Sequence, residues 1–302
     1  MPTSRPLALA TILAALACSS AQRTKTETEL ANVLVPPEQE KQLGVQVKQQ
    51  LEQEQHVQYI DDPTVTSYVN DVAGKILAQA KKDRPDVQWT VSVINDPKQV
   101  NAFATPGGYL YVYSGLLEAA DDTAEVAGVL GHESGHVVAR HSARQMVDQF
   151  GLETLASIAL GNDPGAASKL AAGLAGQTGM LAFSRADESE ADEYGARYAS
   201  AAGYDPHGLV TFFQKLEKGE GKQPGWARYL STHPLTPDRI TKIEAYIQKN
   251  HLTGSGGTSS TEIAKVKERL KSIPPPPEQP KTQTPPGGTS GGGTQPAPGG
   301  GK

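Results

Sequence analysis

The chain has 302 residues and a formal net charge of −5, from 28 basic and 33 acidic side chains. A chain of this length can bury one substantial core, with room for a small second unit. No basic stripe with interleaved aromatic residues occurs, so nothing in the charge pattern favours a nucleic-acid partner. Helix formers and small residues dominate, while aromatic residues make up only 6%, which favours a helix-rich fold.

The first residues are typical of an export signal. The apolar run from Leu7 to Ala17 follows a single Arg and is too short to cross a bilayer as an ordinary helix. Cys18 comes directly after it and is the only cysteine, so it cannot form a disulfide within the chain. Its position resembles the acceptor cysteine of bacterial lipoproteins. We therefore expect a signal peptide over residues 1–21 and lipidation of Cys18; the competing hypothesis is plain secretion.

Helical patterns begin after a linker over residues 22–36. A polar stretch from Pro37 to about Gln55 is the first. Asp61-Asp62-Pro63 then forms a helix-start signal, with Asp as the cap and Pro in the first turn. The apolar residues after it recur every three to four positions, which predicts an amphipathic helix.

The hydrophobic period then changes to two. Apolar residues alternate with polar ones from Val87 to Val93, which predicts a half-buried strand. A second short run contains Phe103, and a third spans Tyr109 to Tyr113 after the turn Pro106-Gly107-Gly108. Three short strands in succession predict a small antiparallel sheet packed on helices.

The rest of the chain is helical until the composition changes near its end. We expect helices over 123–141, 152–160, 168–181, 188–202 and about 236–249, the second and third rich in Ala and Gly. Residues 274–302 contain nine Pro and eight Gly among 29 positions and cannot bury enough apolar surface to fold. The prediction is an α+β, mostly α-helical domain over residues 37–250, followed by a disordered tail over 251–302 with a short helix at 262–272.

The run His132-Glu133-Ser134-Gly135-His136 carries the strongest chemical signal. Two histidines four apart on a helix share a face, so both imidazoles can bind one zinc ion at about 2.0–2.1 Å. Glu133 is then placed beside the open coordination position, where it can act as general base on a zinc-bound water. Gly135 lets another backbone approach closely. The pattern predicts a hydrolytic site with one Zn²⁺ per chain.

A catalytic zinc needs a third protein ligand. His141 lies five residues after His136, so on a continuous helix it is rotated by about 140° and points away. The segment 183–195 offers five carboxylates, and spacing alone leaves Glu188 and Glu190 almost equal, although Glu188 and Asp192 share a helix face.

Four motifs occur in a fixed order: Asn101 to Gly108, the run His132 to His136, Ser184-Arg185 through Glu188-x-x-Ala191-Asp192-x-x-Gly195, and His233-Pro234. Together they resemble the HtpX / CaaX-prenyl-protease family of zinc metallopeptidases, over about Pro37 to Lys249. The resemblance is close to the soluble, periplasmic, often lipid-anchored branch of that family.

The resemblance implies a zincin-like domain of the gluzincin type and assigns roles to several residues. Glu188 becomes the third zinc ligand, and Asp192 orients a zinc-bound histidine through its second ring nitrogen. The strand residues Asn101, Ala102, Phe103 and Ala104 are expected to line the cleft, where an extended substrate can add by backbone hydrogen bonds.

For His233 two roles stay open besides packing. Its imidazole can stabilise the tetrahedral oxyanion, or it can take the fourth zinc position and keep the enzyme latent. Arg239, which also matches the family, is expected to form a structural ion pair.

The function implied is a zinc metalloendopeptidase acting on unfolded or misassembled cell-envelope proteins. The alternative is an envelope-protein assembly factor or chaperone with latent protease activity. A third hypothesis, zinc kept only as a structural element, is disfavoured because Glu133 is intact. We expect the protein to be exported from the bacterial cytoplasm, to lie in the periplasm, and to be anchored to the outer membrane through lipidated Cys18.

Overall fold

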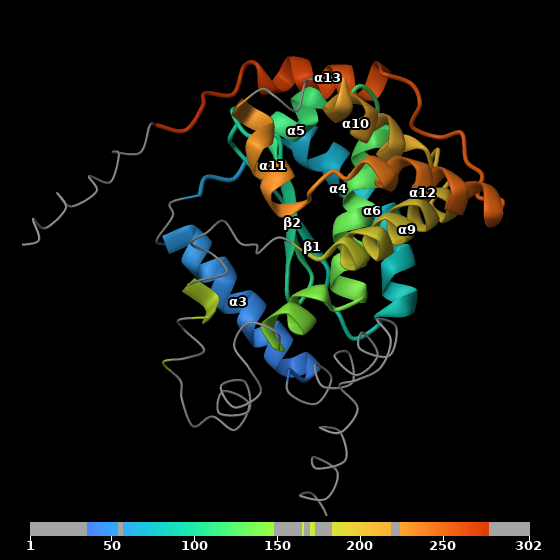
Figure 1. The fold of residues 1–302 in the computed structure, drawn as a ribbon. Helices are drawn as coiled ribbons and strands as arrows, with labels where there is room; N and C mark the ends of the chain where they lie inside the picture. Colours follow the sequence, from blue (N-terminus) through green and yellow to red (C-terminus); the bar gives the residue numbers. More distant parts are fainter. Residues whose placement is uncertain are drawn as a thin grey trace, which may run out of the picture.

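The computed structural model describes residues 35–53, 57–147, 165, 170–172, 183–218 and 224–277. Within these ranges the chain is mostly helical, with one three-stranded sheet (Figure 1). The predicted signal peptide with Cys18 lies outside the described residues, as do the predicted helix 152–160, most of 168–181 and the end of the tail. None of the described helices combines the length and the apolar character needed to cross a bilayer.

Within the described residues, two helices precede the sheet, α3 (Pro37–Gln53) and α4 (Pro63–Asp83). The predicted cap of α4 is confirmed: the Asp62 carboxylate accepts hydrogen bonds from the backbone N–H groups of Thr64, at 3.0 Å, and Val65, at 3.4 Å. One face of each helix is buried, as the spacing of their apolar residues requires.

The sheet contains β1 (Thr90–Ile94), β2 (Ala102–Thr105) and β3 (Tyr109–Tyr113), in the order β1-β3-β2. The predicted fold class and the presence of three strands are confirmed, but β1 begins at Thr90 instead of Val87, and the sheet is mixed rather than antiparallel. β2 and β3 form an antiparallel hairpin, whereas β1 and β3 are parallel. The hairpin places β3 between the other two strands, and its turn depends on Gly107 and Gly108, whose φ angles are 84° and 92°.

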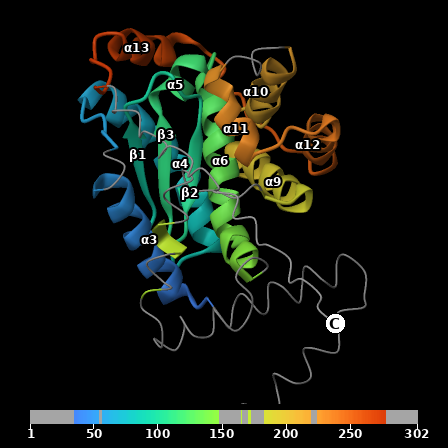
Figure 2. The ribbon, with the colours of Figure 1, turned by 60° about the vertical axis from the view of Figure 1, so that its left-hand side comes forward.

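Both faces of the sheet are covered. Successive side chains of a strand point to opposite faces. Phe103 and Tyr111 pack with α3 in one core cluster, and Ala104, Leu110 and Val112 belong to the larger cluster formed with α4 and with a later helix, α6 (Thr123–Val138). Figure 2 shows α3 and α6 on opposite sides of the strands. The hairpin that carries the predicted substrate strand is therefore held between two helical layers.

Seven α-helices and one 3₁₀ turn follow the sheet in the part of the chain that the structure describes. Their bounds are α5 (Ser114–Ala119), α6 (Thr123–Val138), α9 (Arg185–Ala201), α10 (Gly208–Glu217), η3 (Pro224–Trp226), α11 (Ala227–Thr232), α12 (Pro237–Lys249) and α13 (Thr261–Leu270). The central helix, α6, packs on α4, α9, α10 and β2 (Figure 1). A Cβ added at Gly135 would lie 2.7 Å from Cβ of Tyr194 and 3.1 Å from the carbonyl oxygen of Ala191, which confirms that Gly135 admits a second backbone.

The helix that carries the histidines ends earlier than predicted, at Val138 instead of His141. Arg140 has a left-handed φ of 59°, and a new helical segment covers residues 141–147. The Arg140 guanidinium is held by Glu40 of α3, with 3.2 Å between Nε and Oε2. The chain therefore changes direction at Arg140, shortly after His136 in the sequence.

The helix α13 lies within the segment expected to be a tail. Its residues Ile263, Val266 and Leu270 are buried in the larger core cluster, and the helix packs on α4 and α5. Arg269 also forms an ion pair with Asp62, at 2.7 Å. The part of the tail from residue 278 onward lies outside the described residues, so its disorder stays a prediction.

Candidate metal centre

Two helices in contact supply the side chains of the candidate site. His132 and His136 project from one face of α6, and Glu188 and Asp192 project from one face of α9. A capping box starts α9 just before Glu188: the Ser184 hydroxyl accepts the N–H of Asp187, whose carboxylate accepts the N–H of Ser184. Local sequence signals thus fix where this helix begins.

The ligand atoms of four buried side chains converge: His132, His136, Glu188 and His233. The Nε2 atoms of His132 and His136 are 3.0 Å apart, and Glu188 oxygens lie 3.7 Å and 3.6 Å from them. Around a tetrahedral ion with bonds of about 2.0–2.1 Å, neighbouring ligand atoms lie about 3.3–3.4 Å apart. The donor set and its spacing therefore fit a metal ion such as zinc.

His233 completes this set from the end of α11. Its Nδ1 lies 3.2 Å from Nε2 of His132 and 3.1 Å from Oε1 of Glu188. The Tyr229 ring packs on the His233 imidazole, with 5.1 Å between ring centroids. Its Nδ1 therefore lies among the candidate ligand atoms of the other three residues.

Two buried carboxylates dominate the electrostatics of the cluster. Burial would raise the pKa of Glu188, but the charges of His233, His132 and Arg239 lower it to about 2. Burial would likewise lower the pKa of His233, yet Glu188 and Glu133 raise it. A cation in this position, either the imidazolium of His233 or a metal ion, is therefore stabilised by the surrounding charges.

Asp192 and Arg239 support the ligands from behind. The Asp192 carboxylate lies 2.9 Å from Nδ1 of His132, the ring nitrogen that faces away from the cluster. Arg239 donates two hydrogen bonds to Asp192, at 2.6 Å and 2.8 Å, and lies 2.7 Å from Glu188. Arg239 is almost completely buried. It forms the structural ion pair that was expected from the sequence, and its partners are Asp192 and Glu188.

Glu133 lies beside the cluster and not in it. Its Oε1 is 3.4 Å from Nε2 of His233, and its side chain is 1% exposed. Burial raises the pKa of Glu133, while His233 and His132 oppose the shift. Among the described residues, neither carboxylate oxygen has a hydrogen-bond partner of good geometry. The Glu133 carboxylate is therefore easier to protonate than an exposed one, as general acid–base chemistry requires.

The predicted substrate strand lies against α6. Asn101, Ala102, Phe103 and Ala104 are all buried, the last three within β2. β2 pairs with β3 on one side, is the last strand of the sheet as described, and contacts α6, the helix that carries Glu133.

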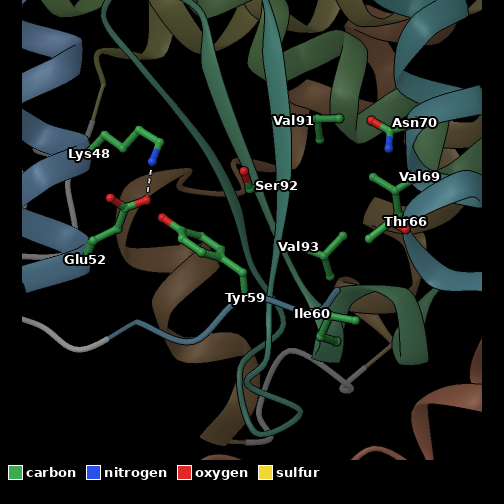
Figure 3. Close-up of a pocket in the computed structure, with 10 residues that line it drawn as sticks. All are labelled: Lys48, Glu52, Tyr59, Ile60, Thr66, Val69, Asn70, Val91, Ser92 and Val93. Atoms are coloured by element: carbon green, nitrogen blue, oxygen red, sulfur yellow. Dashed lines mark hydrogen bonds and ion pairs between the residues drawn. The ribbon is translucent and has the colours of Figure 1, made fainter. Parts of the chain in front are cut away.

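A separate pocket of about 220 Å³ lies at the opposite, β1, edge of the sheet (Figure 3). Lys48 and Glu52 of α3 form an ion pair there beside Tyr59, and Val91 to Val93 of β1 form one wall. The pocket contains none of the clustered histidines or Glu188, so it is distinct from the candidate metal centre.

Sequence reasoning missed two side chains that touch His136. Phe183 stacks on its ring, with centroids 4.0 Å apart, and His141 lies at its edge, with 2.7 Å between the two Nδ1 atoms. His141 was expected to point away because a continuous helix was assumed, and the turn at Arg140 removes that assumption. Glu190, the rejected ligand, pairs with His141 and Arg144; their hydrogen bonds, first that of His141, lower its pKa to about 2.

Comparison with known proteins gives consistent matches. The profile of peptidase family M48 matches residues 61–247. The chain is 34% identical over 207 residues to the Beta-barrel assembly-enhancing protease of Yersinia pestis, covering 65% of this chain and 42% of that protein. It is 34% identical over 182 residues to the Mitochondrial metalloendopeptidase OMA1 of Schizosaccharomyces pombe, covering 60% and 53%.

A third relative, the Metalloprotease LoiP of Escherichia coli, is 36% identical over 150 residues, or 48% of this chain and 58% of that protein. The chain thus spans about half the length of these relatives. The residues matched by the family profile run from the start of α4 into α12 and include every residue of the candidate metal centre.

Proposed function

Because the chain belongs to peptidase family M48, a family of metalloproteases, we propose that it is a zinc-dependent endopeptidase. The proteases that its sequence motifs resemble belong to the same family. The observation that carries the proposal is the buried cluster of His132, His136 and Glu188 with the carboxylate of Glu133 beside it. Nitrogen and oxygen donors in a tetrahedral arrangement suit zinc.

The catalytic roles follow from the donor set. His132, His136 and Glu188 hold the ion, and zinc bound there supplies Lewis acidity toward water and a peptide carbonyl. Glu133 acts as general base: it takes a proton from the attacking water and delivers it to the leaving amine. Its buried position and raised pKa support both transfers. Asp192 holds the ring of His132 in the orientation that presents Nε2.

The substrates are proposed to be unfolded or misassembled cell-envelope proteins. β2 at the end of the sheet can pair with an extended peptide through its backbone, a mode that tolerates varied side chains and requires an unfolded segment. The relatives named Beta-barrel assembly-enhancing protease support the envelope as the place of action.

One observation favours a second function, in envelope-protein assembly with the protease latent. Nδ1 of His233 lies within reach of the same ion as the three ligands, and a neutral imidazole is a good zinc ligand. With four protein ligands the site is closed, as structural zinc sites are. Activity then requires that His233 move away.

The location of the protein is part of the proposal. An export signal followed by Cys18 supports delivery to the periplasm and attachment to the outer membrane through a lipid. Mass spectrometry of the mature N-terminus tests this point. An acylated Cys18 is expected, and a mature chain that begins after Cys18, or carries it unmodified, would contradict attachment.

The activity is tested by casein cleavage with the wild type, Glu133→Gln and His233→Ala, each checked for zinc content. Glu133→Gln keeps the size of the side chain and removes the base, so we expect a loss of activity of at least about 100-fold. Equal cleavage by the wild type and Glu133→Gln would refute the proposed peptidase. Faster cleavage by His233→Ala supports latency, and much slower cleavage supports the oxyanion role instead.

A further inference from the structure

His141 is fully buried and does not belong to the four-residue cluster, yet it touches one of its members. Its Nδ1 lies 2.7 Å from Nδ1 of His136, the ring nitrogen of His136 that faces away from the cluster. Its other nitrogen, Nε2, lies 3.2 Å from Glu190 and 3.5 Å from Asp187, both on the first turns of α9. A chain of contacts therefore runs from Nδ1 of His136 through the ring of His141 to the carboxylates of Glu190 and Asp187.

These contacts define where the protons lie. To bind a metal, Nε2 of His136 must present its lone pair to the cluster, so the neutral ring carries its proton on Nδ1. Nδ1 of His141 must then be unprotonated in order to accept that N–H. A neutral His141 consequently carries its proton on Nε2, from which it donates to Glu190. One assignment of protons therefore satisfies the contacts of His141 with both His136 and Glu190.

We propose that His141 is a positioning residue for the metal, which accepts the Nδ1–H of His136 and fixes the tautomer and orientation in which His136 binds. The inference rests on the proposed function only for the identity of the ion. Metal-binding histidines generally donate their second N–H to a fixed partner, and loss of that partner lowers metal affinity about 10–100-fold. The Asp192 carboxylate lies 2.9 Å from Nδ1 of His132, and His141 occupies the corresponding place at Nδ1 of His136.

The local backbone explains how a residue five positions later reaches the back of His136. If α6 continued, His141 would be rotated by about 140° from His136. Instead, α6 ends at Val138, and Arg140, with its left-handed φ, turns the chain. The next helical segment therefore begins with His141 beside Nδ1 of His136. With Phe183 stacked on one face of the ring, His136 is held both by packing and by a hydrogen bond.

A second metal ion is the alternative use of this group, because the ligand atoms of His141, Asp187 and Glu190 lie within 4.8 Å of one another. Arg144 argues against it. Its guanidinium lies 2.9 Å from Glu190 and 3.0 Å from Asp187, so both carboxylates already have a cationic partner. The group is therefore better suited to anchor His141 than to hold a cation.

The test compares zinc affinities of the full chain by competition with a chromogenic chelator, together with zinc stoichiometry. His141→Phe keeps a ring and removes the acceptor, so we expect about 10–100-fold weaker zinc binding. His141→Asn retains an acceptor, Oδ1, near the position of Nδ1, so its affinity should stay within about 3-fold of the wild type. Lys215→Met is the matched control, because it breaks a buried ion pair with Glu125 at the far end of α6.

A second test observes the tautomer in the zinc-loaded wild type labelled with ¹⁵N-histidine, and uses His141→Asn only to assign the signal. Among the seven histidines, the signal that His141→Asn removes is that of His141, and it should show the Nε2–H tautomer. This measurement applies even when His141→Phe does not fold.

Four outcomes would overturn the inference: zinc affinity of His141→Phe within 2-fold of the wild type, equal losses for the Asn and Phe variants, an equal loss for Lys215→Met, or two zinc ions per chain with one lost on substitution of His141. Failure of the proposed function is recognised separately. A wild type that binds zinc and does not cleave casein refutes the peptidase, while the affinities still decide the role of His141.

Discussion

Arg239 is the single cation between the two carboxylates of α9 that support the metal centre. The substitution Arg239→Met removes the charge and keeps much of the side-chain volume. It also keeps the packing on Phe213, whose ring centroid lies 4.4 Å from the guanidinium carbon of Arg239. Both hydrogen bonds to Asp192 and the contact with Glu188 are lost. Two carboxylates, each no more than 3% exposed, then remain without their cation.

Removing one partner of a buried ion pair costs about 3–5 kcal/mol of unfolding free energy. For a domain of this size, 1 kcal/mol corresponds to about 2–4 °C in Tm, so Arg239→Met should lower the Tm of the zinc-free protein by about 6–20 °C. Bound zinc offsets part of the charge of Glu188, so the loss should be smaller in the zinc-loaded protein. The exposed pair between Arg269 and Asp62 provides the control, since Arg269→Met should change stability much less.

The measurement is urea unfolding of the wild type, Arg239→Met, Asp192→Asn and the double variant. Because Arg239 and Asp192 are in direct contact, their effects should not add, and the double variant should be more stable than additivity predicts by about 0.5–3 kcal/mol. Strictly additive losses, or a loss below about 1 kcal/mol for Arg239→Met, would show that this ion pair does not support the site.

Three further predictions concern packing, pH and the metal. Gly135→Ala should lower the unfolding free energy by about 1–3 kcal/mol, because its Cβ would meet Tyr194 at 2.7 Å; unchanged urea midpoints would contradict this close packing. Since the pKa of Glu190 is lowered from 4.5 to about 2, its contribution to stability is fully present above about pH 4.5 and is lost as the pH falls toward 2. The stability difference between zinc-free wild type and Glu190→Gln should therefore shrink over that range, and a difference independent of pH would refute the assignment. Removal of zinc by a chelator should lower the Tm by about 8–16 °C if zinc is present at about 1,000 times its Kd, whereas an unchanged Tm would argue against a metal bound to the native state.

The features that the sequence predicted well are those that depend on neighbouring residues. The cap of α4 at Asp62, the strand periods and the close contact at Gly135 follow from local geometry. The spacing of His132 and His136 likewise needs only a helix. Each of these properties extends over a few residues, so a single sequence contains enough information to infer it.

The features that it missed depend on contacts between distant segments. The parallel pairing of β1 with β3 follows from the strand order, which strand periodicity does not reveal. Spacing alone could not separate Glu188 from Glu190, and only the family resemblance selected Glu188; in the structure α9 turns Glu188 toward the histidines and Glu190 toward Arg144. The position of His141 depends on one left-handed residue, Arg140, and Arg is not a residue type that signals such a turn.

The complete burial of the metal cluster has a consequence for measured affinities. If His233 is the fourth ligand in the resting protein, as proposed, a peptide can bind productively only to molecules in which this residue, 1% exposed, has moved away. The apparent dissociation constant is then the intrinsic constant divided by the fraction of open molecules. If one molecule in 100 is open, the apparent binding free energy of a substrate is about 2.7 kcal/mol weaker than its intrinsic binding free energy for the open form. Any partner that binds the open form would restore that free energy, and would raise protease activity without touching the peptide.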